Sequence, residues 1–395
     1  MSSLPSRERR IRPANRRDLI VAAATELFAA RGYEYVGMSD IAEAVAVRPS
    51  ALYRHFSGKE QLLAEILRRG AANLQSAVSA LDLTDGPDGL IELAGFVIDN
   101  RHIAALVGRE APHLSEASRS GLRSALGTTG RLFADKIASV RPQLCPHGAR
   151  FLASATLAVL ESPAYHRAEL PRAEYCAEVA RLAWRVISAS LPLDFTGAQV
   201  PPSHSGLLPY SRREALLAQA IALFAERTYA GVGIEDVAAS LGIAGPSVYN
   251  HFRSKSEILA TALGRGTARL LMQVTDTLAT ADGPEAALRT LMASYADFTI
   301  EHPALIDLMI SEVRSLPEPD REATMAAQRD YVAELVHLLR QVYPELSPAS
   351  ARVQIQAALM IANDVARASD LSDQAGSTQT VVTLIKQMLA LPRPT

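Results

Sequence analysis

A stretch of 47 residues that occurs twice decides the fold of this chain. Residues 17–63 read RDLIVAAATELFAARGYEYVGMSDIAEAVAVRPSALYRHFSGKEQLL, and residues 213–259 read REALLAQAIALFAERTYAGVGIEDVAASLGIAGPSVYNHFRSKSEIL. The two stretches align without a gap at an offset of 196 residues, and 17 of the 47 positions are identical. A period of this size is that of a whole domain and exceeds any solenoid repeat. We therefore expect two copies of one protein joined head to tail.

The bulk composition is that of a soluble helical protein. The 395 residues allow two or three domains, and 48% of them are hydrophobic but only 5% aromatic. Cys145 and Cys176 share no metal or redox spacing, which predicts free thiols in a reducing cytosol. No apolar run approaches the length of a membrane span, and no apolar signal segment follows the basic N-terminus. A cytoplasmic location without membrane contact is expected.

Each copy predicts three helices in its first part. A first apolar stripe ends at Arg31-Gly32, and a short second helix follows at Met38 to about Val45, or Ile234 to Leu241. Gly37 and Gly233 are its expected N-caps. After a three-residue turn we expect a third helix that extends to the His-Phe pair. Two short helices with such a turn indicate a helix-turn-helix, although helical bundles of other kinds contain the same pattern.

The segment after the turn makes this prediction more specific. Residues 52–63 read LYRHFSGKEQLL and residues 248–259 read VYNHFRSKSEIL, and the strings LFA and DIA or DVA stand upstream of both. This resembles the DNA-binding domain of the TetR (tetracycline-repressor-like) family of transcriptional regulators, over about 50 residues in each half. The resemblance implies an all-α fold of two tandem helix-turn-helix domains. Each would be followed by a helical bundle for ligand binding and dimerisation, the halves forming a pseudo-dimer.

The domain limits follow from the repeat and from a Pro/Ser/Gly-rich segment between the halves. We expect a basic arm at 1–14, helix-turn-helix domains at 15–63 and 211–259, regulatory domains at 64–192 and 260–395, and a linker at 193–210.

The resemblance also assigns the residues that contact a double-stranded DNA operator. Tyr53 and Tyr249 are expected to bind phosphate, and Lys59 and Lys255 likewise, since a cation at a helix start is unfavourable for the helix dipole. The full set is Arg48, Pro49, Ser50, Ala51, Tyr53, Arg54, His55 and Lys59 with Gly245, Pro246, Ser247, Tyr249, Asn250, His251 and Lys255. Six arginines among residues 7–17 suggest an arm on the phosphates or in the minor groove, for which we assign Arg9, Arg10, Arg12, Arg16 and Arg17.

Both copies depart from the family pattern around the third helix. Arg48 and Ala244 stand where the family has an N-capping Ser or Thr, and Gly37 and Gly233 replace the usual Thr of the second helix. Pro49 fits the first helical position, whereas Gly245-Pro246 predicts that the second copy starts one residue later. Ala46 replaces the turn glycine that Gly242 retains.

The two recognition segments differ, which predicts an imperfectly palindromic operator. Arg54 would favour guanine and Asn250 adenine if either reaches a base edge. Residues 1–69 hold 12 Lys and Arg against 8 acids, and residues 211–265 hold 6 against 5. The first copy should therefore supply more of the affinity for DNA.

The helical remainder of each half is less informative. Apolar stripes near 151–160 and 174–190, and near 352–366 and 378–390, suit either a four-helix interface or the core of a single domain. By resemblance, a small apolar or amphipathic effector would bind in this region and release a repressor from DNA. Polar residues there fit an ordinary structural role as well as a pocket, so no pocket residue is assigned; they are His102, His113, Tyr165, Tyr295, His302 and Asn363.

Other functions remain as alternatives. The sequence holds no phosphate loop, metal-spaced His/Cys cluster or nucleophile elbow, so no catalytic residue, metal or cofactor is expected. A ligand-independent architectural DNA-binding protein is the main alternative to the repressor. In a third reading only one half binds DNA and the other half serves for dimerisation. Further pairing of the chain into a homodimer also remains open.

Overall fold

The computed structural model describes residues 16–191, 198, 207 and 209–391. All regular elements within these residues are helices, and they form two successive sets in the same order. The all-α tandem fold is confirmed. Most of the expected linker and the first 14 residues lie outside the described residues.

The first half contains nine α-helices and three 3₁₀ helices among its described residues. These are α1 (Arg16–Arg31), α2 (Met38–Ala44), α3 (Pro49–Leu52), α4 (Lys59–Ala80), η1 (Asp88–Leu90), α5 (Ile91–Asp99), α6 (Arg101–Glu110), η2 (Ala111–His113), α7 (Glu116–Val140), α8 (Pro146–Glu161), η3 (Ser162–Ala164) and α9 (Arg172–Ile187).

The second half repeats this order, with the short helix α17 in the place of η3 and, among the described residues, no helix in the place of η1. Its elements are α10 (Arg212–Arg227), α11 (Ile234–Ser240), η4 (Gly245–Asn250), α12 (Lys255–Thr280), α13 (Pro284–Glu301), α14 (Pro303–Ser311), η5 (Val313–Ser315), α15 (Glu318–Val342), α16 (Pro348–Arg367), α17 (Ser369–Ser372) and α18 (Ser377–Met388).

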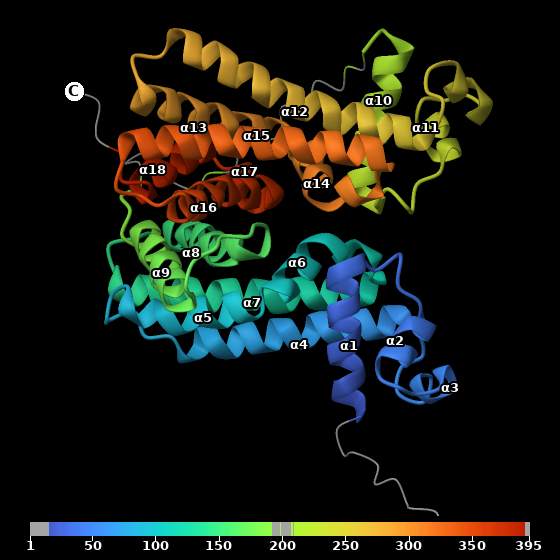
Figure 1. The fold of residues 1–395 in the computed structure, drawn as a ribbon, viewed down its shortest axis with the longest axis horizontal. Helices are drawn as coiled ribbons and strands as arrows, with labels where there is room; N and C mark the ends of the chain where they lie inside the picture. Colours follow the sequence, from blue (N-terminus) through green and yellow to red (C-terminus); the bar gives the residue numbers. More distant parts are fainter. Residues whose placement is uncertain (1–15, 192–197, 199–206, 208, 392–395) are drawn as a thin grey trace, which may run out of the picture.

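Each half carries a small domain at one end of a longer bundle (Figure 1). In the first half α1, α2, α3 and the start of α4 enclose a core that includes Phe28 and Phe56, both fully buried. Phe224 and Phe252 have the same place in the second half, as the sequence predicts. The long helices α4 and α12 run from the small domain into the bundle, so the expected limits at residues 63 and 259 fall inside continuous helices.

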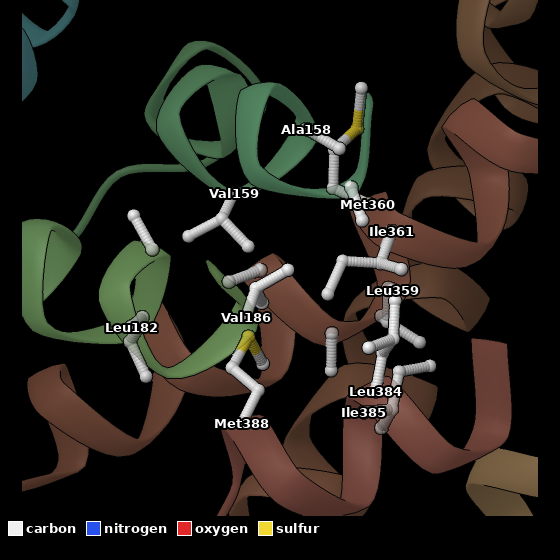
Figure 2. Close-up of a cluster of buried hydrophobic side chains, with 14 of the residues drawn as sticks. Ala158, Val159, Leu182, Val186, Leu359, Met360, Ile361, Leu384, Ile385 and Met388 are labelled. Carbon is white, nitrogen blue, oxygen red and sulfur yellow. The ribbon is translucent and has the colours of Figure 1, made fainter. Parts of the chain in front are cut away.

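The two halves face each other through four helices, α8 and α9 from the first and α16 and α18 from the second (Figure 1). Figure 2 shows Val186 of the first half beside Met388 of the second, with Leu182 on one side of this pair and Leu384 and Ile385 on the other. All five side chains have no exposed surface, and one continuous cluster of buried residues includes both halves. Burying one such side chain stabilises the fold by about 1.5–3 kcal/mol. The apolar stripes thus form an interface between the halves.

Hydrogen bonds across this interface fix its register. The Ser154 hydroxyl donates to Asp364 Oδ2 at 2.7 Å, and the Gln354 amide donates to Glu178 Oε1 at 2.9 Å. The amide of Gln387 both donates to and accepts from the backbone of Ser190, each at 2.9 Å. The first two pairs are partly buried, and because buried polar groups are costly without a partner, they disfavour sliding of one half along the other.

Among the described residues, no helix has the length and apolar character that crossing a membrane requires.

The shared core predicts that the two halves unfold together. Leu384→Ala should lower the free energy of unfolding by about 2–5 kcal/mol, because it removes a fully buried side chain between the halves. Urea denaturation followed by circular dichroism should give one transition, displaced as a whole. Met272→Ala is the control, since Met272 on α12 is 66% exposed, and should change stability by at most about 0.5 kcal/mol. Two separate transitions, only one of them moved by Leu384→Ala, would contradict the prediction.

Candidate nucleic-acid interface

The second helix of each small domain begins as the sequence predicts. Gly37 and Gly233 are the N-caps of α2 and α11. Their N–H groups donate to the carboxylates of Asp40 and Asp236, each at 2.7 Å. A glycine has no side chain to cap the helix, so in both copies the aspartate supplies the only side-chain part of the cap.

The turn after this helix has the same geometry in both copies despite its different sequence. Ala46 has a φ of 52° and Gly242 a φ of 66°, both in the left-handed region. An alanine is strained in this region and a glycine is not. The backbone therefore closes the turn in the first copy at a local cost, with the N–H of Val47 donating to Ala42 O at 2.9 Å.

The recognition segment is shorter than the sequence predicts. The third helix was expected to extend to His-Phe, but α3 ends at Leu52 and η4 ends at Asn250 as a 3₁₀ helix. Single turns follow, in which the N–H groups of Phe56 and Phe252 donate to Leu52 O and Val248 O. This anchors each phenylalanine in the core beneath.

The expected start of the second recognition segment is also wrong. η4 begins at Gly245 after an N-cap at Ala244, the position equivalent to Arg48, and not one residue later. The N–H of Ser247 donates to Ala244 O at 2.9 Å, as Ala51 does to Arg48 O at 2.8 Å. Pro246 is tolerated at the second position because the N–H it lacks would have no partner within the helix.

The outer surface of both recognition segments is formed by the residues assigned to DNA. Tyr53 and Tyr249 are 55% and 56% exposed, which excludes a core role for either phenol. The others with exposed side chains are Arg48, Pro49, Ser50, Arg54, Pro246 and Asn250, and those that are partly buried are Ala51, His55, Gly245, Ser247 and His251.

The two lysines at the start of α4 and α12 have partners within the protein. Lys59 Nζ donates to Tyr33 O at 2.8 Å and lies 4.1 Å from the centre of the Tyr33 ring. Lys255 Nζ donates to Tyr229 O and Val232 O, at 2.8 and 2.9 Å, and lies 4.2 Å from the Tyr229 ring. Burial lowers the pKa of Lys255. Carbonyl and ring contacts thus account for a cation at these helix starts, and contact with phosphate stays a prediction.

In each half a glutamate from the helical bundle also bonds the loop that contains this tyrosine. The backbone N–H of Tyr229 donates to Glu312 Oε1 at 3.1 Å, and that of Tyr33 donates to the carboxylate of Glu110. We call the lysine, the tyrosine backbone and the glutamate the tyrosine clamp. It joins the loop before α2 or α11 to α4 and α6, or to α12 and the end of α14. The tyrosines and glutamates of the clamp were not expected from the sequence, although Tyr33 and Tyr229 are identical in the two copies.

Of the five arm arginines, Arg9, Arg10 and Arg12 lie outside the described residues. Arg17 lies 4.8 Å from the centre of the Phe56 ring and 3.4 Å from Glu65. Its equivalent Arg213 lies 3.9 Å from the Phe252 ring and donates to His251 O. The pair therefore has a structural role in both copies. Arg16 is partly exposed at the start of α1.

The surfaces around the two recognition segments differ in charge. Glu235 of α11 lies beside the start of η4, where a Cβ added to Gly245 would be 3.5 Å from its Cγ. The first copy has Ser39 at this position, and has Arg48 and Arg54 where the second has Ala244 and Asn250. The first surface is therefore the more favourable for a phosphate backbone.

The possible pocket groups in the second half pair with one another. The Tyr295 hydroxyl donates to Asn363 Oδ1 at 2.8 Å, and the Tyr295 ring stacks on Tyr331 at 5.9 Å between centres. Burial raises the pKa of Tyr295 to about 12, so the phenol remains a hydrogen-bond donor at neutral pH. These contacts give both residues a structural role.

Comparison with known proteins agrees with this architecture. The family model described as "Bacterial regulatory proteins, tetR family" matches twice, at residues 20–66 and 216–262. A second model, "Tetracyclin repressor-like, C-terminal domain", matches residues 281–367. Both copies of the helix-turn-helix are thus found independently of the internal alignment.

Individual relatives match over segments no longer than one half. The HTH-type transcriptional repressor KstR2 of Rhodococcus jostii is 32% identical over 137 residues, which are 33% of this chain and 67% of that protein. KstR2 of Mycolicibacterium smegmatis is 33% identical over 114 residues, 26% of this chain and 54% of the relative. The activator FasR of M. smegmatis is 43% identical over 63 residues, 16% and 29% of the two chains. The chain thus spans about half or less of the last two relatives.

A solved TetR-family regulator from Bordetella parapertussis aligns with 46% of this chain and 94% of its own, at 20% identity and a TM-score of 0.42. With the two matches to the helix-turn-helix model and the R. jostii relative, the assignment is clear. The chain belongs to the TetR family, as a tandem duplication.

Alanine and glycine should differ in their effect on stability at the turn between the two short helices. Ala46→Gly should raise the free energy of unfolding by about 1 kcal/mol, because glycine adopts the positive φ without strain. Gly242→Ala should lower it by a similar amount through backbone strain, since nothing lies within 4 Å of an added Cβ. Chemical denaturation of the two variants measures both effects. Loss of stability on Ala46→Gly would show that the turn is unstrained.

Proposed function

We propose that this chain is a sequence-specific DNA-binding transcriptional regulator that acts as an intramolecular pseudo-dimer. The observation that carries the proposal is the pair of exposed recognition segments, one on each small domain, in a chain whose two helical bundles share one core. Symmetric helix-turn-helix dimers place two recognition helices in successive major grooves, about 34–36 Å apart. Here a single chain supplies both, and α8, α9, α16 and α18 take the place of the dimer interface.

The DNA contacts are proposed for the surfaces described above. Tyr53 and Tyr249 would contact phosphate, and Arg54 and Asn250 would read base edges of two different half-sites. A covalent pseudo-dimer is free of the symmetry that a homodimer imposes, so the operator is an imperfect palindrome. The second half has Glu235 and lacks counterparts of Arg48 and Arg54, so it contributes less of the salt-dependent affinity for DNA.

We further propose that the regulator is a repressor released by a small molecule. The two KstR2 relatives are named repressors, which supports the repressor reading. The tyrosine clamp supports the control by a ligand, because it gives the regulatory helices a direct contact with each DNA-binding domain. A ligand that binds one arrangement of α6 or α14 better than another would shift the population of DNA-competent chains. If the chain is instead an architectural DNA-binding protein, no small molecule changes its affinity for DNA.

Selection of binding sites from random duplexes tests the reading of two half-sites. Wild type should select an imperfect palindrome with one chain per site, as measured by the mass of the complex. Arg54→Ala should relax the preference at one base pair of one half-site by roughly 5- to 150-fold, and Asn250→Ala at one base pair of the other. Arg123→Gln, on the exposed face of α7, should select the wild-type site. A perfect palindrome, or relaxation of both half-sites by one variant, would contradict the proposal.

The unequal contribution of the copies is tested on the selected site. Tyr53→Ala should weaken binding more than Tyr249→Ala, since the first surface carries the greater positive charge. The loss from Tyr53→Ala should be about tenfold, as for the removal of one contact to phosphate, and the loss from Tyr249→Ala should be smaller. Titration by fluorescence anisotropy at two salt concentrations measures the affinities. Equal losses from the two variants would contradict unequal contributions, and no loss from Tyr249→Ala would leave the second half as a dimerisation partner only.

A further inference from the structure

A groove of about 700 Å³ separates α1 from the regulatory part of the first half. One wall is α1, through Glu26, Ala29 and Ala30. The other is formed by the end of α5, the start of α6, the segment before α9, and α9 itself. We call this feature the α1–α9 groove. Figure 1 shows one end of α1 next to α6, and the two helices are in contact.

The surface of the groove combines apolar and cationic groups. Ala29, Ile98 and Leu170 supply apolar surface, and three arginines supply charge. Arg172 is neutralised, since its Nε and NH2 donate to the two carboxylate oxygens of Asp99 at 3.0 and 2.6 Å. This pair ties α9 to α5 and keeps the wall of the groove in place.

The other two arginines have no partner of this kind. Arg101 and Arg167 are exposed, and neither makes a hydrogen bond or ion pair with any residue that the structure describes. Glu26 is the one further carboxylate in the lining. Two guanidinium groups therefore stand against a single acid, and the groove has an excess of positive charge.

A partly buried histidine contacts the lining of the groove at Tyr175. His166 Nδ1 is buried without a hydrogen-bond partner, and its Nε2 lies 3.4 Å from the hydroxyl of Tyr175, which lines the groove. Burial, followed by the charges of Arg352 and Arg101, lowers the pKa of His166 to about 4. The imidazole is neutral at pH 7, so it adds no positive charge and leaves the anion-attracting role to the arginines.

We propose that the α1–α9 groove binds a small amphipathic anion. Arg101 and Arg167 hold its oxyanion head group, for which the guanidinium fork has the right geometry. Its apolar body lies along Ala29, Ile98 and Leu170, in the manner of ligand pockets with a few charged groups on an apolar surface. The head group is a carboxylate or a phosphate, which share this chemistry.

The second half cannot form the same site. At the offset of 202 that aligns the regulatory helices, the positions of Arg101, Arg167 and Arg172 are occupied by Pro303, Ser369 and Gln374. None of the three replacements carries a charge. Each chain therefore holds one such site, which adds a functional asymmetry to that of the recognition segments.

The position of the groove gives the ligand a structural consequence. Its α1 wall belongs to the first DNA-binding domain, and its other wall belongs to the regulatory helices. A ligand that contacts both walls favours one placement of that domain on the bundle. Binding itself is independent of the proposed function. Only an effect on operator affinity rests on that function.

Isothermal titration calorimetry without DNA tests the site on the full chain. Hexanoate, octanoate and octyl phosphate are the anionic probes, and octanol is the uncharged control. At least one anion should bind with one site per chain, and octanol at least tenfold more weakly. Arg101→Gln combined with Arg167→Gln should weaken the anion at least tenfold. Arg123→Gln combined with Arg131→Gln removes the same charge from exposed positions of α7 and should change the affinity less than twofold.

The outcomes separate the proposals. Absence of heat with all three anions, equal binding of octanol, or equal affinity in the two double variants would overturn the site. The tighter of octanoate and octyl phosphate identifies the head group. A chain that binds none of the anions but still selects an operator would overturn this inference alone. A chain that binds an anion but selects no DNA sequence would overturn the proposed function alone.

Discussion

The contact between α8 and α9 on one side and α16 and α18 on the other is the constraint on which the rest of the structure depends. It joins two copies of a domain into one body whose bundles share a buried core, while each small domain keeps a core of its own. Leu182 and Leu384 have equivalent positions in the two copies and are both completely buried there. Because the centre of this surface is formed by buried apolar side chains, neither half could expose it to water at a small cost. The arrangement of the two DNA-binding domains follows from it.

The tyrosine clamp carries that constraint to the small domains. In each copy a lysine holds the carbonyl of the loop tyrosine, and a glutamate from the regulatory side holds its N–H. The loop leads directly into the helix-turn-helix, so the placement of α6 or α14 bears on the recognition segment. The first copy adds the ring of His113, stacked 5.0 Å from that of Tyr33, where the second has Ser315. The two clamps are therefore alike in topology but differ in their supporting contacts.

Duplication has left the two halves with the same scaffold and different surfaces. Phe28 and Phe224 are both buried, and the glycine N-caps of α2 and α11 bond their aspartates at the same distance. Exposed positions of the recognition segments differ in charge, as Arg54 does from Asn250. The buried pair Ile20 and Leu216 differs only in the shape of an apolar side chain. The α1–α9 groove is a further difference in surface, because its arginines have counterparts without charge in the second half. Packing constrains the core positions, whereas the surface positions are free to acquire separate roles.

The sequence by itself determined the duplication, the helical class, the helix-turn-helix, its caps and its buried phenylalanines. These features follow from the order and spacing of residues within a single segment, so no contact between distant segments is needed to predict them. It did not determine the end of the recognition segment, because the turn at Leu52 to Phe56 is set by anchoring of the phenylalanine in the core. Nor could it decide whether the stripes of Val186 and Ile385 served one domain or an interface, or which atoms Lys59 and Lys255 bind. Those outcomes were decided by the tertiary structure, since each depends on groups brought together from distant parts of the chain.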